Sequence, residues 1–293
     1  MEVMARPTFD KNPSLIVRAR HFVQAAFLLA WLGPFGLRLH YLCGPVFHCY
    51  ACPLATFACP IGVLANFSAL SVSPLIAVGT LILVGALLGG VICGWVCPFG
   101  LVQDLLDKVP LPKLRLPVWL GYTRYAVLVG LVLVVPYFFG ESHPLFICRV
   151  CPAGALEAGL PLAADAVARG DSFWTGMSAV KWIILGVFLV GAMVKYRPWC
   201  TLFCPLGAIL GLFNPAAVFR LRVDQKKCTS CGACKRTCKI GLEPHRQLRD
   251  PLCIRCMECT RCEAVGVENA LGKKKDAESK TNDSATATQA ASE

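Results

Sequence analysis

Charged side chains are scarce in this chain, and their scarcity excludes the ordinary soluble class of protein. Only 16% of the 293 residues are Asp, Glu, Lys or Arg, while 56% are hydrophobic. A soluble domain of this size carries about 25% charged residues. The mean hydropathy of +0.58 points the same way. We therefore predict an α-helical membrane protein.

Histidine and acidic residues are also few. The five histidines include no pair inside one apolar stretch, so nothing in the sequence indicates an intramembrane haem. Eighteen acidic residues stand against 29 basic ones, which gives a net charge of +11. We attribute this excess to basic flanks of membrane spans and to lysines beside an anionic cofactor. It requires no nucleic-acid partner.

Four apolar stretches are long enough to cross a bilayer as helices. They cover residues 21–39, 74–92, 120–139 and 177–196. The first lacks a small-residue cleavage site, so we predict a retained helix and not a removed signal peptide. The distribution of Lys and Arg around the spans predicts that both termini are cytoplasmic.

The predicted spans belong to a membrane domain over residues 1–217, followed by a small cysteine-rich domain over 218–272. Residues 273–293 lack aromatic and large aliphatic side chains. Such a segment cannot bury enough apolar surface to fold, and we predict a disordered tail.

Cysteine is abundant, with 18 residues in the chain. A disulfide scaffold suits short secreted domains, so metal–thiolate ligation is the better explanation in a long, membrane-like chain. Eight cysteines cluster near the C-terminus in two runs with C-x2-C-x2-C triplets. They are Cys228, Cys231, Cys234 and Cys238, then Cys253, Cys256, Cys259 and Cys262.

These two runs have the spacing of bacterial ferredoxins with two [4Fe–4S] clusters, in which each triplet takes its fourth ligand from the other run. We predict that one cluster binds Cys228, Cys231, Cys234 and Cys262. The other is predicted to bind Cys253, Cys256, Cys259 and Cys238. Zinc ribbons also use C-x2-C pairs and are the alternative. The runs depart from the ferredoxin pattern at Lys239 and Glu263, which replace the usual proline, and in the x2 gap before Cys262.

Paired cysteines also flank the predicted spans, in the order x2, x3, x2, x3 along the chain. This order is an internal repeat of about a hundred residues, so we predict two repeated helical hairpins. The x3 pairs form a candidate inner site of Cys93, Cys97, Cys200 and Cys204. The x2 pairs form a candidate outer site of Cys49, Cys52, Cys148 and Cys151. Each site is predicted to hold a cluster, another metal or disulfides.

Proline follows the second cysteine of every pair, and a residue before proline avoids the α conformation. We therefore predict that Cys97 and Cys204 lie at helix breaks. Cys59-Pro60-x-Gly62 repeats the motif that begins at Cys151, which makes Cys59 an alternative outer ligand. Cys43 is isolated, and we predict a packing role for it.

The motifs Cys93-x3-Cys97-Pro98 and Cys200-x3-Cys204-Pro205, together with the C-terminal runs, resemble the NapH family of four-span membrane iron–sulfur proteins, with its NosR-like and CcoG-like members. The resemblance implies a multi-pass protein of the bacterial inner membrane with two cytoplasmic [4Fe–4S] clusters. It also implies quinol as electron donor and periplasmic reductases as the destination, reached through partner proteins. The outer pairs are not part of that family pattern and suggest a route for electrons to the outer face.

The sequence thus predicts an electron-transfer protein embedded in membrane lipid. It would connect the quinol pool or cytoplasmic donors with a periplasmic or cytoplasmic redox partner. Whether it acts as a quinol dehydrogenase subunit stays open, and no catalytic residue is assigned. Two alternatives also stay open, namely a transmembrane thiol–disulfide relay and a copper or metal reductase or metal-handling protein.

Overall fold

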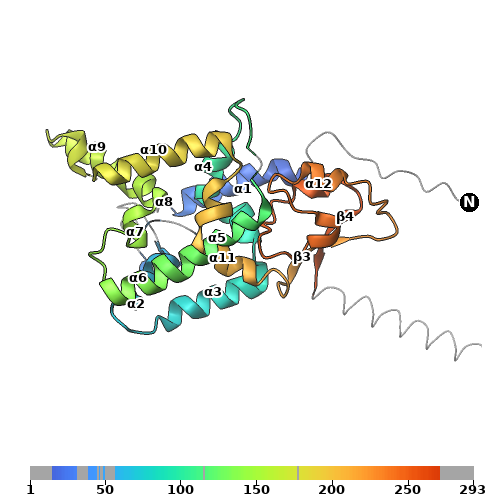
Figure 1. Cartoon of the computed structure of the whole chain (residues 1–293), viewed down its shortest axis with the longest axis horizontal. Helices are drawn as coiled ribbons and strands as arrows, with labels where there is room; N and C mark the ends of the chain where they lie inside the picture. The colour runs from blue at the N-terminus through green and yellow to red at the C-terminus, as the bar shows by residue number, and fades with distance from the viewer. Residues whose placement is uncertain are drawn as a thin grey trace, which may run out of the picture.

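The structure is a computed structural model that describes residues 15–31, 39–44, 46, 49, 57–114, 116–176 and 178–270. The predicted outer ligand Cys52 and the predicted tail 273–293 lie outside the described residues. The described part is mostly helical and elongated, with the membrane-like helices at one side and the C-terminal unit at the other (Figure 1).

The longest apolar helical run covers Val118–Phe139. It consists of η2 (Val118–Tyr122), α5 (Thr123–Val127), η3 (Leu128–Val134) and α6 (Val135–Phe139). Within the described residues it is the one helix that is long and apolar enough to cross a membrane. It coincides with the predicted span 120–139.

Two shorter apolar helices, α3 (Leu75–Leu88) and α10 (Ala179–Val194), occupy the second and fourth predicted spans. They run along the long axis of the molecule, as α5 and α6 do (Figure 1). The second helix is shorter than the predicted 74–92 because Gly89 ends α3 with φ at +53°. That left-handed conformation is readily available to glycine and interrupts the helix.

The first helix differs from the predicted span 21–39 at both ends. α1 covers Leu15–Trp31, whereas Leu39 belongs to β1 (Leu39–Cys43), which pairs in parallel with β2 (Phe57–Ala58). The early start places Arg20 inside the helix, where its guanidinium is buried and ion-paired with Asp104 at 3.1 Å. A hydropathy average places such an arginine outside the span, because it cannot detect an ion-pair partner that is distant in sequence.

Four further helices each begin at a Cys-Pro step. They are α2 (Pro60–Ala69), α4 (Pro98–Leu106), α8 (Pro152–Gly154) and α11 (Pro205–Leu212). The cysteine before each proline is extended, with ψ between 111° at Cys204 and 125° at Cys59. Proline suits the first helical position because its fixed φ is helical and no N–H is needed there. The break predicted at Cys97 and Cys204 is thus also the start of a new helix.

The first cysteine of each x3 pair lies on a π-helical turn, η1 (Ile92–Val96) or η6 (Trp199–Phe203), and the second cysteine follows that turn directly. The Cys97 N–H donates to Ile92 O at 3.0 Å, and the Cys204 N–H donates to Trp199 O at 2.8 Å. In an uninterrupted α-helix, the x3 spacing would place the two cysteines one turn apart on a single helix face. A π turn followed by an extended cysteine replaces that arrangement, and π turns are frequent at functional sites.

Between the third and fourth predicted spans lie α7 (Ile147–Val150), η4 (Ala155–Gly159), α9 (Leu160–Ala168) and η5 (Phe173–Gly176). Helices α2, α7, α8 and α9 lie at the end opposite the C-terminal unit (Figure 1). The cysteines that begin α2 and α8 are therefore far from those of the C-terminal runs.

The C-terminal unit is built on the antiparallel pair β3 (Phe219–Val223) and β4 (Val265–Asn269), with Leu221 opposite Val267. Between the strands lie α12 (Ala233–Thr237), α13 (Pro244–Gln247) and η7 (Glu258–Arg261). The small buried core contains cysteines beside Leu221 and Val265. All eight C-terminal cysteines fall between the two strands, so closing this sheet gathers them into one unit.

Candidate iron–sulfur sites

The structure brings together the four cysteines of the predicted inner site. Cys93 and Cys200 lie on the two π turns, while Cys97 and Cys204 begin α4 and α11. All four are buried. The thiol of Cys204 interacts electrostatically with those of the other three. One set of four neighbouring thiols thus joins the two repeated halves of the chain.

Polar N–H groups are directed at these sulfurs. The Gly207 N–H donates to Cys204 Sγ at 3.3 Å, and the side-chain amide of Gln103 donates to Cys200 Sγ at 3.1 Å. A β-carbon on Gly207 would lie 3.3 Å from Cys200 O, so glycine permits the close turn. Such bonds favour a thiolate and tune the potential of a cluster that it binds.

Buried positive charge surrounds the inner site. Arg197 is fully buried, and its Nη1 donates to Cys93 O at 2.8 Å. Arg124, also buried, interacts electrostatically with Cys93. Buried charge is unfavourable unless it is compensated, and thiolates carrying an anionic cluster would compensate it. In the sequence, Arg197 is one of the basic residues that follow the fourth predicted span, and nothing local reveals its partners.

Asp104 organises this charge. It accepts from Arg197 Nε at 2.7 Å and pairs with Arg20 at 3.1 Å. Burial opposes ionisation of Asp104, but Arg197 and Arg20 outweigh that effect and hold the pKa of this carboxyl below its usual range. Arg20 also reaches Glu258 in the C-terminal unit, at 3.6 Å. One buried network therefore connects the first helix, the inner site and the C-terminal unit.

The C-terminal cysteines group across the two runs. Cys234 of the first run interacts electrostatically with Cys262 of the second and with Cys228. Cys259 interacts with Cys256, Cys253 and, from the first run, Cys238. Cys231 is exposed. Each of these two groups thus contains cysteines from both runs, and the crossed ligation of two clusters stays a prediction.

The second run packs directly on the inner site. A β-carbon on Gly94 would lie 2.7 Å from Ile254 O, and one on Gly90 would lie 2.7 Å from Cys253 O. The Arg20 guanidinium donates to Cys256 O at 3.1 Å. The backbone that carries Cys253 and Cys256 therefore lies against the turn that carries Cys93, with no side chain between them at Gly90 and Gly94.

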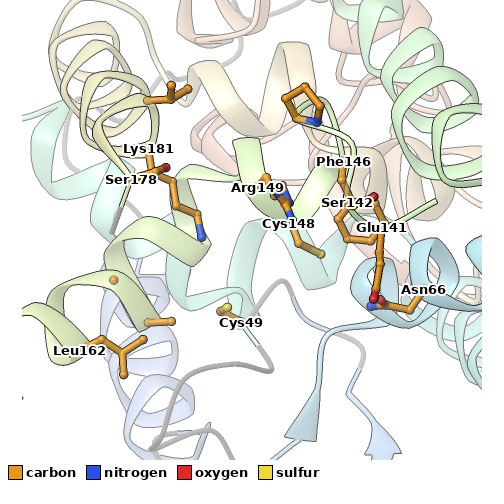
Figure 2. Close-up of a pocket in the computed structure, with 14 residues that line it drawn as sticks. Cys49, Asn66, Glu141, Ser142, Phe146, Cys148, Arg149, Leu162, Ser178 and Lys181 are labelled. Carbon is orange, nitrogen blue, oxygen red and sulfur yellow. The ribbon is translucent and has the colours of Figure 1, made fainter. Parts of the chain in front are cut away.

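The outer cysteines that the structure describes also come together. Cys151 interacts electrostatically with Cys49, Cys148 and Cys59. Cys49 and Cys148 line a cavity of about 670 Å³ (Figure 2). Burial, followed by the charge of Cys49, raises the pKa of Cys148 to about 11. The predicted ligand Cys52 lies outside the described residues.

The donor sets fit iron–sulfur clusters. Each set supplies thiols, up to four in number, as a [4Fe–4S] cluster requires. Among the described residues, no group of three or more His, Cys, Asp or Glu side chains is arranged to hold a metal ion. Thiolates on a cluster bind different iron atoms and are spread more widely than the ligands of one ion.

Comparison with known proteins identifies the family. The profile described as "4Fe-4S binding domain" matches residues 70–117 and 179–223. An uncharacterized protein of Methanocaldococcus jannaschii is 33% identical over 227 residues, which cover 73% of this chain and 87% of that protein. The chain belongs to this 4Fe-4S binding family. No solved structure matches.

Two further relatives of this chain have descriptive names. The ferredoxin-type protein NapH of Haemophilus influenzae is 28% identical over 211 residues, or 67% of each chain. The putative electron transport protein YccM of Escherichia coli is 27% identical over 186 residues, which cover 61% of this chain and 50% of YccM. The chain thus spans between half and two thirds of these two relatives. The predicted resemblance to NapH-type proteins is confirmed, and with it membership of a ferredoxin-type electron-transport family.

The matched segments contain the inner cysteines and not the C-terminal runs. Residues 70–117 include Cys93 and Cys97, and residues 179–223 include Cys200 and Cys204. The region that defines the family is therefore the pair of segments that the structure joins at the inner site.

Proposed function

We propose that the chain is a membrane-bound protein that passes electrons between the quinol pool or cytoplasmic donors and a redox partner at the periplasmic face. The observation that carries this proposal is the close packing at Gly94, whose β-carbon position is 2.7 Å from Ile254 O. A C-terminal set of thiols and the inner set are thereby neighbours, as successive carriers in an electron path must be.

The proposed cofactors are two [4Fe–4S] clusters on the crossed C-terminal sets and a third cluster on the inner set. The clusters would supply one-electron carriers. The chain's own residues hold them, donate hydrogen bonds from Gly207 and Gln103, and balance their charge with Arg197 and Arg124. These contacts set the potential at which electrons enter and leave.

The proposed membrane arrangement has four spans as two repeated hairpins in the bacterial inner membrane, with both termini cytoplasmic. Large apolar side chains exposed along the helices support it, such as Leu75 at 77% and Ile82 at 52% on α3, and Ile183 at 66% and Val187 at 69% on α10. A protein in water rarely exposes so continuous an apolar surface, because exposure costs hydrophobic free energy. Lipid would cover it.

Iron and acid-labile sulfide in the purified protein, with low-temperature EPR, test the cofactor assignment. About eight irons per chain indicate the C-terminal clusters alone, and about twelve or more indicate that the membrane cysteines bind clusters too. Iron below about four per chain, with one zinc per cysteine set, overturns the proposal.

Membrane vesicles test which donor supplies electrons to the clusters and so the direction of electron flow. Addition of a reduced quinol analogue under anaerobic conditions is expected to reduce the clusters. Their reduction is measured as a loss of absorbance in the visible range. Clusters that stay oxidised with quinol but are reduced by a cytoplasmic donor would remove quinol from the proposal. If the membrane cysteines cycle between thiol and disulfide with no change in iron, the thiol–disulfide relay replaces electron transfer through clusters there.

A further inference from the structure

We propose that an iron–sulfur cluster binds Cys49, Cys59, Cys148 and Cys151 at the end of the helical unit opposite the C-terminal unit, with Cys59 in place of the predicted ligand Cys52. This inference extends the proposed function, on which it rests, by adding a carrier at the outer face. Three sets of observations support it, namely the helix starts, the contacts at Gly154 and the adjoining cavity.

The first observation is that Cys59 and Cys151 begin helices in the same way as the inner cysteines Cys97 and Cys204. Each is extended, each is followed by proline at the first helical position, and ψ is 125° at Cys59 and 118° at Cys151. The inner site thus combines two such helix-start cysteines with two others. Cys59 and Cys151, together with Cys49 and Cys148, repeat that composition at the other end.

Cys59 differs from Cys52 in having a glycine three residues further along the chain. The glycines are Gly62, Gly100, Gly154 and Gly207, after Cys59, Cys97, Cys151 and Cys204 respectively. Cys52 is also followed by proline, but Ala55 stands where the glycine would be. At the inner site this glycine has a defined use, since the Gly207 N–H donates to Cys204 Sγ.

The second observation is the convergence of sulfurs at Gly154. Its N–H donates to Cys151 Sγ at 3.4 Å, and a β-carbon built on it would lie 3.5 Å from Cys49 Sγ. The same position is 3.8 Å from Cys148 O. Three cysteines therefore surround one glycine, and Cys59 belongs to the same buried core as Cys151.

The third observation concerns the two sides of the site. Cys59 and Cys151 are buried, with 8% of their surface exposed, and belong to the core that also contains Cys93 and Cys97. Cys49 and Cys148 are half-buried and line the cavity of about 670 Å³. One side of the site thus faces the protein interior and the other faces an opening.

The cavity carries basic side chains that suit an anionic group. Arg149 and Lys181 line it beside Cys49 and Cys148 (Figure 2), together with Glu141. A cluster here would take one electron from the inner side and release one electron to an acceptor at the cavity, with no bond of the chain formed or broken.

Matched serine variants of the full-length protein test this inference. Purified anaerobically, Cys59→Ser and Cys151→Ser are each expected to lose about four irons per chain relative to the unmodified protein, and one EPR component with them. Cys52→Ser is the control, since it removes a neighbouring cysteine followed by proline, and it is expected to retain all the iron.

The EPR signals of the C-terminal clusters separate the outcomes. If those signals persist while Cys59→Ser keeps its full iron content, the outer cluster on Cys59 is wrong and the proposed function stands. If Cys52→Ser loses iron and Cys59→Ser does not, the assignment of Cys59 as the ligand in place of Cys52 is wrong. If thiol titration finds a disulfide in the unmodified protein and all variants keep their iron, the site is a dithiol pair and not a cluster site. Absence of the C-terminal signals from the unmodified protein overturns the proposed function itself.

A folding defect in Cys59→Ser is recognised by loss of all clusters together. For that case Cys148→Ala, at a half-buried wall of the cavity, provides a second test, because its replacement disturbs less of the core. It is expected to remove the same EPR component and to leave the C-terminal signals intact. Retention of that component in Cys148→Ala contradicts the outer site.

Discussion

Arg197 and Asp104 form a buried ion pair between the two repeated halves of the chain, with Arg197 Nε 2.7 Å from Asp104 Oδ1. The two residues are 93 positions apart in sequence, and their side chains are no more than 2% exposed. The same arginine donates to Cys93 O. The pair therefore fixes the two cysteine-bearing turns relative to each other, and Arg20 extends it to the first helix.

Replacing Asp104 by leucine is expected to lower the stability strongly. The change leaves Arg197 and Arg20 buried without their shared carboxylate, and removal of one partner of a buried pair costs about 3–5 kcal/mol. Thermal unfolding of the cluster-loaded protein in detergent measures the loss. The control is Asp165→Asn, which breaks an exposed pair with Arg169 and is expected to cost less than about 1 kcal/mol. Equal shifts for the two variants would contradict a structural role for the buried pair.

Gly94→Ala is expected to separate the C-terminal unit from the inner site. The added β-carbon would lie 2.7 Å from Ile254 O and 2.8 Å from Arg255 O, both backbone atoms that cannot turn aside. Electron transfer between the clusters should slow, as measured by stopped-flow absorbance after rapid reduction, while iron content is retained. Gly130→Ala, with nothing within 4 Å of its β-carbon, is the control and should behave as the unmodified protein. An unchanged rate in Gly94→Ala would show that this contact is not on the electron path.

Crossed ligation at the C-terminus predicts which cluster each variant disturbs. Cys262→Ser should perturb the cluster that also binds Cys234, and Cys238→Ser the one that also binds Cys259. EPR of the two variants should therefore show changes in two different components. Cys43→Ser is the control, since Cys43 is the cysteine predicted to pack only. If both variants change the same EPR component and no other, the crossed assignment is wrong.

Gln103→Leu is expected to shift the potential of the inner site downward while its iron is retained. The Gln103 amide donates to Cys200 Sγ at 3.1 Å and is fully buried. Loss of a hydrogen bond to a ligand sulfur destabilises the reduced, more negative form, by an amount on the order of tens of millivolts. A redox titration followed by EPR measures the change. Thr80→Val, which removes a hydroxyl bonded to its own helix at Ala77 O, is the control and should not move the potential.

Reporter fusions test the proposed orientation. Alkaline phosphatase is active only outside the cytoplasm, so a fusion after Gly170, in the connection that precedes α10, should be active. A fusion after Glu293 should be inactive, whereas a fluorescent protein fused there should fold and emit. Activity of the C-terminal phosphatase fusion would place the cysteine-rich unit on the other side and reverse the proposed topology.

The sequence by itself determined the features that depend on neighbours along the chain. Proline after Cys97 and Cys204 predicted interrupted helices, because the constraint acts on the preceding residue alone. The continuous apolar run predicted the helix at Val118–Phe139, since hydropathy sums over adjacent residues. The C-terminal spacing predicts crossed ligation, since each triplet supplies three thiols and in two-cluster ferredoxins the fourth ligand comes from the other run. This assignment stays a prediction.

The tertiary structure decided the features that depend on residues distant in sequence. Arg20 lies inside α1 because Asp104 compensates its charge. Cys59 and Cys151 belong to one buried core, and the second C-terminal run lies against Gly94. A hydropathy window and a cysteine spacing contain no information on such contacts, since the partners are brought together only when the helices pack. The physical reason is that burial and pairing are properties of the assembled chain, whereas helix breaks and ligand spacing are properties of a few consecutive residues.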